Sequence, residues 1–199
     1  MTSDLDVRHL SICAMVGATM ATVMSATPVF AHTGHGTAGL WDGLAHPVLG
    51  IDHVFAMVAV GVLAMTMVRP LAAPAAFLGA MVAGGVLGIA GLSLPGGETA
   101  IAISVAALGA ALIAGQAMRP AWALGLVGAA GLVHGHAHGA EAPSASHPVV
   151  YVAGFVVATA SLHLAGVGLG LFARRRSATR TAIGTVLLGA GAGLVVGLL

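Results

Sequence analysis

Histidine is the residue of this chain whose placement most clearly points to chemistry. The 199 residues include ten His, against only six Asp and Glu together. Two groups lie inside long apolar runs: Asp52 with His53, and His134 with His138. Imidazole and carboxylate groups suit Ni²⁺, Co²⁺, Zn²⁺ or Cu²⁺, whereas Mg²⁺ and Ca²⁺ prefer oxygen ligands alone. These residues therefore predict binding of a divalent transition metal.

The first group follows the dipeptide His46-Pro47. Pro suits the first position of a helix, so we expect His46 at the external mouth of a membrane helix. His53 is seven residues further on and would share a helix face with His46, about 10 Å deeper. Because metal–nitrogen bonds are about 2 Å long, one ion cannot bind both, and we expect Asp52 and His53 to form a deeper station. Met57, one turn beyond, is an auxiliary candidate.

The second group occupies the end of another apolar run. His134 and His138 are four residues apart, so they can hold one metal from adjacent helical turns. His136 would point about 200° away from His134 and is only an auxiliary candidate. This helix should run outward, which places His134 at a depth similar to that of His53. The two groups could therefore meet in the outer third of the membrane.

A later apolar run repeats the opening with His147-Pro148, which makes His147 a further auxiliary candidate at the mouth. His163 lies 15 residues beyond Pro148, past the midplane of the bilayer and nearer the cytoplasm. The His residues would thus occupy a mouth, an outer cluster and one deeper position. This order of levels predicts a path, not a single site.

The composition indicates the class of protein to which the chain belongs. Apolar residues make up 58%, mean hydropathy is +1.03, and only 7% are charged, against about 25% in soluble domains. A soluble enzyme, a disordered chain and a nucleic-acid binder, which would need a basic stripe, are all excluded. The lone Cys13 permits no disulfide within the chain. A polytopic membrane protein in the lipid bilayer remains.

Residues 1–31 have the layout of a cleavable signal peptide. Arg8 is followed by an apolar stretch, and Val29 and Ala31 lie where signal peptidase prefers small residues. Cleavage would leave His32 first, and its free amine and imidazole, with His35, are auxiliary metal candidates. The alternative is an uncleaved first transmembrane helix.

The remainder, residues 32–199, is expected to be one all-α domain of six transmembrane helices. Each apolar run is near the ~20 residues that cross a bilayer. The runs cover 44–68, 71–93, 99–118, 121–139, 148–172 and 181–199. The pairs Gly84/Gly88 and Gly125/Gly128 should let helix backbones approach closely. Such Gly-rich faces would also permit a homo-oligomer.

Charge fixes the expected orientation. A cleaved signal puts the mature N-terminus outside, and the loops then obey the positive-inside rule. The expected cytoplasmic residues are Arg69, Arg119, Arg174, Arg175, Arg176 and Arg180. The expected external acids are Asp42, Glu98 and Glu141. We therefore predict a multi-pass protein of a bacterial inner membrane. It carries no nucleotide-binding motif, so a gradient or metal capture would drive transport.

Three motifs resemble those of the HupE/UreJ family of nickel permeases. The first is His46-x5-Asp52-His53 with Met57, Val60 and Gly61, similar to the family's first-helix motif. The second, residues 134–141, resembles its fourth-helix motif HGHAHGAE. The third runs from Gly154-Phe155 to Leu162-His163 and resembles its fifth. The signal and six-helix layout match as well, so the resemblance covers the chain from about residue 32 onward.

The resemblance implies uptake of Ni²⁺, or of Co²⁺, for hydrogenase or urease maturation, with metallochaperones downstream and no prosthetic group. It implies functional roles for the matching positions: His46, Asp52, His53, His134, His138 and Glu141. A rival hypothesis is an intramembrane Zn²⁺ hydrolase, in which His53, His134 and His138 hold the metal and Asp52 acts as base. A metal sensor is a third possibility, although no sizeable soluble domain is expected.

Overall fold

The computed structural model describes residues 39–140 and 148–198. The predicted signal peptide and four candidate residues lie outside these ranges; the four are His32, His35, Glu141 and His147. Seven α-helices and one short 3-10 helix make up the described part, which contains no strand. They are α2 (Leu40–Leu49), α3 (Ile51–Ala64), α4 (Ala72–Ile89), α5 (Gly97–Ala114), η1 (Gly115–Ala117), α6 (Pro120–Ala140), α7 (Pro148–Ala173) and α8 (Ser177–Leu198). The all-α prediction is confirmed.

Among residues 39–140 and 148–198, four helical segments are long and apolar enough to cross a membrane. They are Ala72–Ile89, Gly97–Ala117, Val150–Ala173 and Ser177–Gly197. The pair α2 and α3 would be a fifth if its two parts form one span. Helix α6 has 21 residues but is not one of the four, because three His near its end lower its hydropathy. A multi-pass membrane protein fits these findings, and the sixth span stays a prediction.

The first predicted span, 44–68, is not one continuous helix. It is divided at Gly50, whose backbone is extended (φ −83°, ψ 110°), and the two parts are bent by 81°. Helix α2 begins at Leu40, so Pro47 lies inside it and His46 is not at a helix start. The expected place of Pro47 at the first helical position was therefore wrong. By contrast, α6 and α7 do begin at Pro120 and Pro148, where a missing N–H costs nothing.

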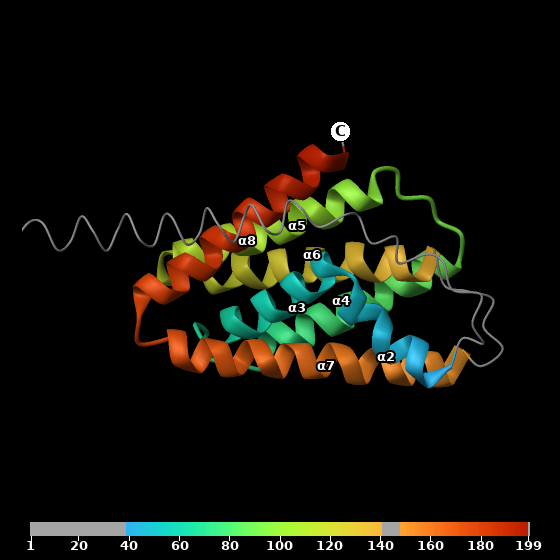
Figure 1. Ribbon diagram of the computed structural model, residues 1–199, viewed down its shortest axis with the longest axis horizontal. Helices are drawn as coiled ribbons and strands as arrows, with labels where there is room; N and C mark the ends of the chain where they lie inside the picture. The colour runs from blue at the N-terminus through green and yellow to red at the C-terminus, as the bar shows by residue number, and fades with distance from the viewer. Residues whose placement is uncertain (1–38, 141–147, 199) are drawn as a thin grey trace, which may run out of the picture. The chain divides into compact units, whose positions relative to one another are not determined.

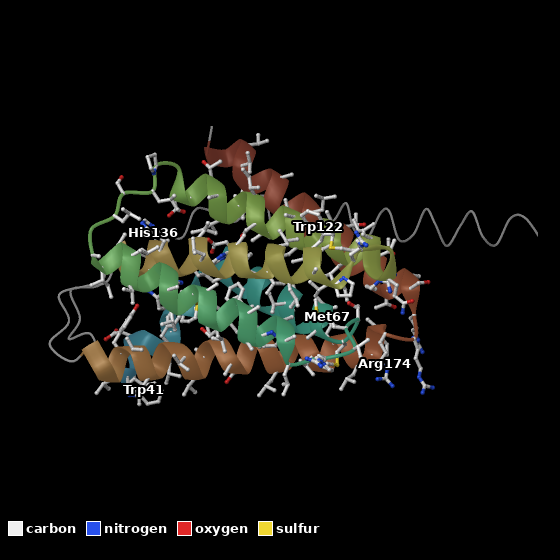
Figure 2. All side chains as sticks on the ribbon, turned by 180° about the vertical axis from the view of Figure 1, so that it is seen from behind. Trp41, Met67, Trp122, His136 and Arg174 are labelled. Carbon is white, nitrogen blue, oxygen red and sulfur yellow. The ribbon has the colours of Figure 1, made fainter. Side chains whose placement is uncertain are left out.

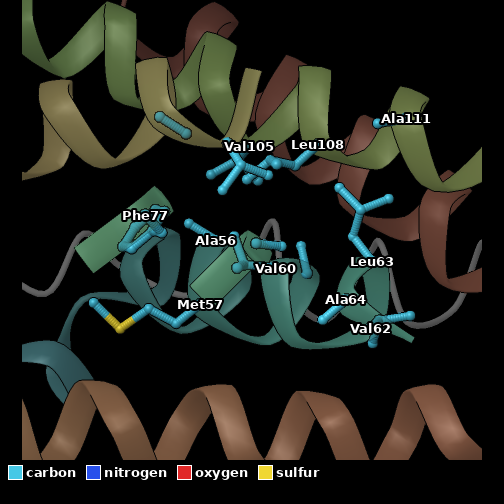
Figure 3. Packing of buried hydrophobic residues seen from close by; sticks show 14 of the residues in the cluster. Ala56, Met57, Val60, Val62, Leu63, Ala64, Phe77, Val105, Leu108 and Ala111 are labelled. Carbon is cyan, nitrogen blue, oxygen red and sulfur yellow. The ribbon is translucent and has the colours of Figure 1, made fainter. Parts of the chain in front are cut away.

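Helix α3 lies at the centre of the helices. It contacts α2, α4, α5, α6, α7 and α8, and Figure 1 shows it lying beside α7. Figure 3 shows its apolar side chains, among them Val60 and Leu63, packed between α7 and the helices on its other side. Eight of its 14 residues are buried. A helix buried on most sides needs small and apolar residues throughout, which the segment IDHVFAMVAVGVLA supplies.

Glycine brings α4 and α6 into direct backbone contact. A Cβ on Gly84 or Gly88 would collide with the backbone of Leu132 or of His136, respectively, so this predicted pair is confirmed. Gly125 and Gly128 have no atom within 4 Å of a Cβ position, and the prediction that they pack closely was wrong. The α6 contact instead uses Gly131, Gly135 and Gly139, at spacings of four, which keeps them on one helix face.

The arginine-bearing loops meet at one end of the helices. A cavity of about 250 Å³ there is lined by residues that follow α3, including Met67, and by residues that follow α5, including Gln116. Arg180 at the start of α8 donates a hydrogen bond from Nε to the Leu112 carbonyl, 3.0 Å away. Figure 2 shows Met67 and Arg174 at this end and His136 at the other.

Candidate metal site

Four imidazole rings from three helices gather where α2 meets α3. Helix α2 contributes His46, α3 contributes His53, and α6 contributes His134 and His138. The His53 ring centroid is 4.5 Å from that of His138 and 5.1 Å from that of His134. The His46 centroid is 4.7 Å from that of His138. We call these four rings the outer cluster.

The bend at Gly50 is what brings His46 into this group. The centroids of His46 and His53 are 6.2 Å apart, although a regular helix would separate them by about 10 Å along its axis. The expectation that His46 lies at a separate, shallower level was therefore wrong. The error came from treating residues 46–53 as one helix, when an extended glycine folds α2 back across the start of α3.

Asp52 holds His53 in one orientation. Its Oδ1 accepts two hydrogen bonds from His53, one from the backbone N–H at 2.9 Å and one from Nδ1–H at 2.7 Å. Both side chains are mostly buried, with 20% of Asp52 and 13% of His53 exposed. A proton held on Nδ1 leaves the lone pair on Nε2, the arrangement by which carboxylates prepare His for metal binding.

Three rings of the outer cluster present an unpaired Nε2 atom. Nδ1–H of His134 donates to the Ala130 carbonyl at 2.9 Å, which fixes the tautomer with the lone pair on Nε2. Nδ1 of His138 shares a hydrogen bond of 2.9 Å with Nε2 of His46. The Nε2 atoms of His53, His134 and His138 are buried and have no hydrogen-bond partner among the residues that the structure describes. Buried polar atoms of this kind require an explanation such as water or an ion.

The cluster as it stands is not a closed coordination shell. Within residues 39–140 and 148–198, no three His, Cys, Asp or Glu side chains are arranged so that they could hold one metal ion. His53 and His134 meet edge to face (87°), whereas His53 and His138 are tilted by 46°. What the structure brings together is a set of nitrogen donors on three helices, whose rings would have to turn to bind one ion.

Aromatic side chains of α7 line the cluster on one side. The Phe155 ring centroid lies 4.6 Å from that of His138 and 6.1 Å from that of His46. Tyr151, one turn earlier, lies 6.1 Å from His46. Neither was predicted from the sequence. Their signal was the rarity of aromatic residues, which are 4% of the chain, together with their spacing along the helix that bears His163.

His163 does not join the outer cluster. It is 4% exposed, and within the described part of the chain neither of its ring nitrogens has a hydrogen-bond partner. Its ring packs against Phe77, with centroids 5.3 Å apart, and Phe77 lies 5.8 Å from His134 on the other side. Thr159, one turn before His163, is fully buried with Oγ1 unpartnered. Phe77 and Thr159 were not among the predicted site residues.

Two auxiliary candidates have other surroundings in the structure. His136 donates from Nε2 to the Leu92 carbonyl at 2.6 Å, in the segment after α4. Met57 is fully buried in the apolar core of the helices. His136 was expected to point elsewhere than His134, and the structure gives it a separate partner.

The comparisons with known proteins give one consistent result. No solved structure matches the chain significantly. Protein HupE of Rhizobium leguminosarum bv. viciae is 43% identical over 185 residues, which cover 90% of this chain and 96% of that protein. A family model described as HupE / UreJ protein matches residues 20–194. The chain therefore belongs to the HupE/UreJ family.

Proposed function

We propose that this protein is a permease that moves Ni²⁺, or Co²⁺, inward across a bacterial inner membrane. The ion would be captured at the outer cluster and would then pass His163 on its way to the cytoplasm. Membership of the HupE/UreJ family supports this cargo, because the family is linked to nickel transport for metalloenzyme assembly. Delivery to hydrogenase or urease through metallochaperones is part of the same proposal.

One observation supports metal capture at the outer cluster above all others. Three imidazole Nε2 atoms, of His53, His134 and His138, are buried without partners within one group of rings. The other nitrogen of each is already engaged. For His53 and His134 the acceptor on Nδ1 is an oxygen, so the neutral ring keeps its lone pair on Nε2, the form that binds Ni²⁺ or Co²⁺. Asp52 adds a negative charge that offsets the removal of water from the cation.

The openness of the site agrees with transport. A cargo site must release its ion, and conduction works through several modest sites instead of one tight one. Rings that meet at 4.5–5.1 Å without a preformed three-ligand arrangement suit an ion that binds and leaves. The hydrolase alternative would require three converging ligands and a retained water, and nothing favours it.

The topology completes the proposal. In it, residues 1–31 are a cleaved signal, α2 and α3 form a broken first span, and α6 is the fourth of six spans. The cluster then lies near the external face and the arginine loops near the cytoplasm, in accordance with the positive-inside rule. Glu141, His147, His32 and His35 would attract cations at the external entrance. A homo-oligomer is compatible with this arrangement.

Radiolabelled uptake in a host that lacks its own nickel transporters tests the proposal. The wild-type chain should accumulate ⁶³Ni²⁺, with competition by Co²⁺, whereas His53→Ala and His134→Ala should lose most uptake. The matched control is His136→Gln, a change on the same helix outside the cluster. Uptake that is equal in all four proteins would contradict the role of the cluster. A wild-type chain that accumulates neither ion would contradict the cargo.

A further inference from the structure

We propose that the ring of Phe77 is a gate that separates the outer cluster from an inner polar pair, Thr159 and His163. In the structure the gate is closed, and the side chain must rotate for an ion to pass. This inference deepens the proposed function, because it concerns the path that the cargo would take. It adds a residue and a step to a path otherwise defined only by His and Asp.

The position of the ring carries the first part of the argument. Phe77 is fully buried, and its ring contacts His134 of the outer cluster at 5.8 Å and His163 at 5.3 Å, between centroids. An apolar ring thus contacts two histidines that carry unpartnered nitrogens among the described residues, namely Nε2 of His134 and both ring nitrogens of His163. Hydrophobic side chains at such constrictions exclude water and hydrated ions.

The helix geometry indicates that His134 and His163 lie at different depths, with Phe77 in contact with both. On α7, His163 is eight residues beyond Phe155, which contacts His138, and this corresponds to about 12 Å along the axis. On α6, His134 is one turn, about 6 Å, inward of His138. About 6 Å of depth therefore remains between His134 and His163, and the Phe77 ring contacts both.

The inner pair has the character of a second station. Thr159 and His163 are four residues apart on α7 and therefore lie on one face. Thr159 Oγ1 and both nitrogens of His163 are buried without a partner, and the two residues are 0% and 4% exposed. Polar groups inside a membrane helix are costly and persist where they contact water, an ion or a polar partner. An ion released by the outer cluster would meet these groups next.

The local packing leaves the side chain as the moving part. The backbone of Phe77 is packed directly against Gly131 of α6, where no Cβ would fit. The α4 main chain at Phe77 is therefore held in place against α6. Rotation of the ring about its own side-chain bonds, instead of a shift of α4, is the motion that would open the path.

Cysteine accessibility tests the gate without depending on transport. In a Cys13→Ser background, which removes the chain's one thiol, His163→Cys and His138→Cys are each exposed to a membrane-impermeant thiol reagent on intact cells. We expect rapid labelling of His138→Cys and little labelling of His163→Cys. Adding Phe77→Ala should accelerate labelling of His163→Cys about tenfold or more, and Phe77→Leu should give an intermediate rate.

The matched control is Leu108→Ala, which truncates another fully buried side chain on α5, a helix that contributes no residue to either station. It should leave labelling of His163→Cys unchanged. Equal labelling of His163→Cys with Phe77 and with Ala at this position would overturn the gate, as would equal acceleration by Leu108→Ala. Uptake of ⁶³Ni²⁺ is measured separately on the wild-type chain: a labelling difference between the Cys variants supports the gate, and absence of wild-type uptake contradicts only the cargo.

Discussion

The hydrogen bonds between Asp52 and His53 predict how much the Asp52 carboxylate contributes to the affinity for the metal ion. Asp52 Oδ1 accepts both the backbone N–H and Nδ1–H of His53, at 2.9 and 2.7 Å. In this geometry Asp52 acts through His53, by fixing its ring and keeping the lone pair on Nε2. Removing the carboxylate should therefore weaken metal capture without removing a nitrogen donor.

The expected magnitude follows from these two contacts. Loss of a carboxylate that orients a metal-binding His costs about 10–100-fold in affinity, which corresponds to about 1.4–2.7 kcal/mol. Asp52→Ala should thus raise the KM for Ni²⁺ uptake by about 10–100-fold. Asp52→Asn keeps a hydrogen-bond acceptor but loses the negative charge. A neutral hydrogen bond has about half the strength of one to a carboxylate. The KM of Asp52→Asn should rise by only about 3–10-fold.

The assay is the concentration dependence of initial ⁶³Ni²⁺ uptake, corrected for the amount of protein in the membrane. Asp42→Ala is the matched control, because Asp42 is an acid on the neighbouring helix α2. Its carboxylate accepts a hydrogen bond from the Gly39 N–H at 2.9 Å and, among the described residues, not from a histidine. The KM of Asp42→Ala should stay near the wild-type value. An unchanged KM in Asp52→Ala, or an equal rise in Asp42→Ala, would refute the positioning role.

The remaining predictions concern glycines with defined neighbours. A Cβ at Gly50 would lie 2.5 Å from Nδ1 of His53, so Gly50→Ala should displace that ring and reduce uptake about tenfold at normal membrane levels; full uptake would contradict this. Gly135→Ala would collide with the Met81 carbonyl and should lower the free energy of unfolding by about 1–3 kcal/mol, whereas Gly128→Ala, in open space, should be neutral or stabilising. Gly115 has φ +55° and ψ −126°, so Gly115→Ala should cost about 1–3 kcal/mol. Thermal unfolding in detergent checks both stability predictions, and identical midpoints for the Gly135 and Gly128 variants would show that the α4–α6 contact is not tight.

Most helix positions could be predicted because their signals are local. Apolar length located the helices from α4 to α8, and the dipeptide His147-Pro148 marked the start of α7. The start of α8 was placed four residues late, at 181 instead of Ser177, because Ser177, Thr179 and Arg180 continue the helix as polar residues beyond its apolar part. Helix ends are set by capping and solvent, which apolar runs do not encode.

The break at Gly50 could not be predicted in the same way. Glycine is common throughout this chain, with 30 copies, and most of those in the helices are regular helical residues. Only tertiary contacts distinguish Gly50 from Gly61 or Gly125. The same limit explains why Gly125/Gly128 was mistaken for a packing pair while Gly131 and Gly135 were missed: spacing identifies a face, but not which face meets a neighbour.

Part of the candidate site could be predicted from the sequence. Asp52, His53, His134 and His138 were expected to come together, since polar groups within apolar runs are costly and tend to share a partner. His46 was assigned to a different level because the bend was unknown. Phe77 could not be identified, because a phenylalanine in an apolar helix looks the same whether it fills the core or separates two histidines.

The bend at Gly50 also places two helix ends, with their partial charges, beside the outer cluster. A helix interrupted within a membrane leaves carbonyl groups at the end of its first part and N–H groups at the start of its second without helical partners, and this is tolerated only against protein or water. The carbonyl end of α2 carries partial negative charge, as cation sites of discontinuous transporter helices require. Asp52, in the first turn of α3, offsets the positive end of that helix. In the proposed function, the carbonyl end of α2 would supply negative potential beside the imidazoles while Asp52 cancels the opposing potential of α3, so the break would favour a cation at the outer cluster.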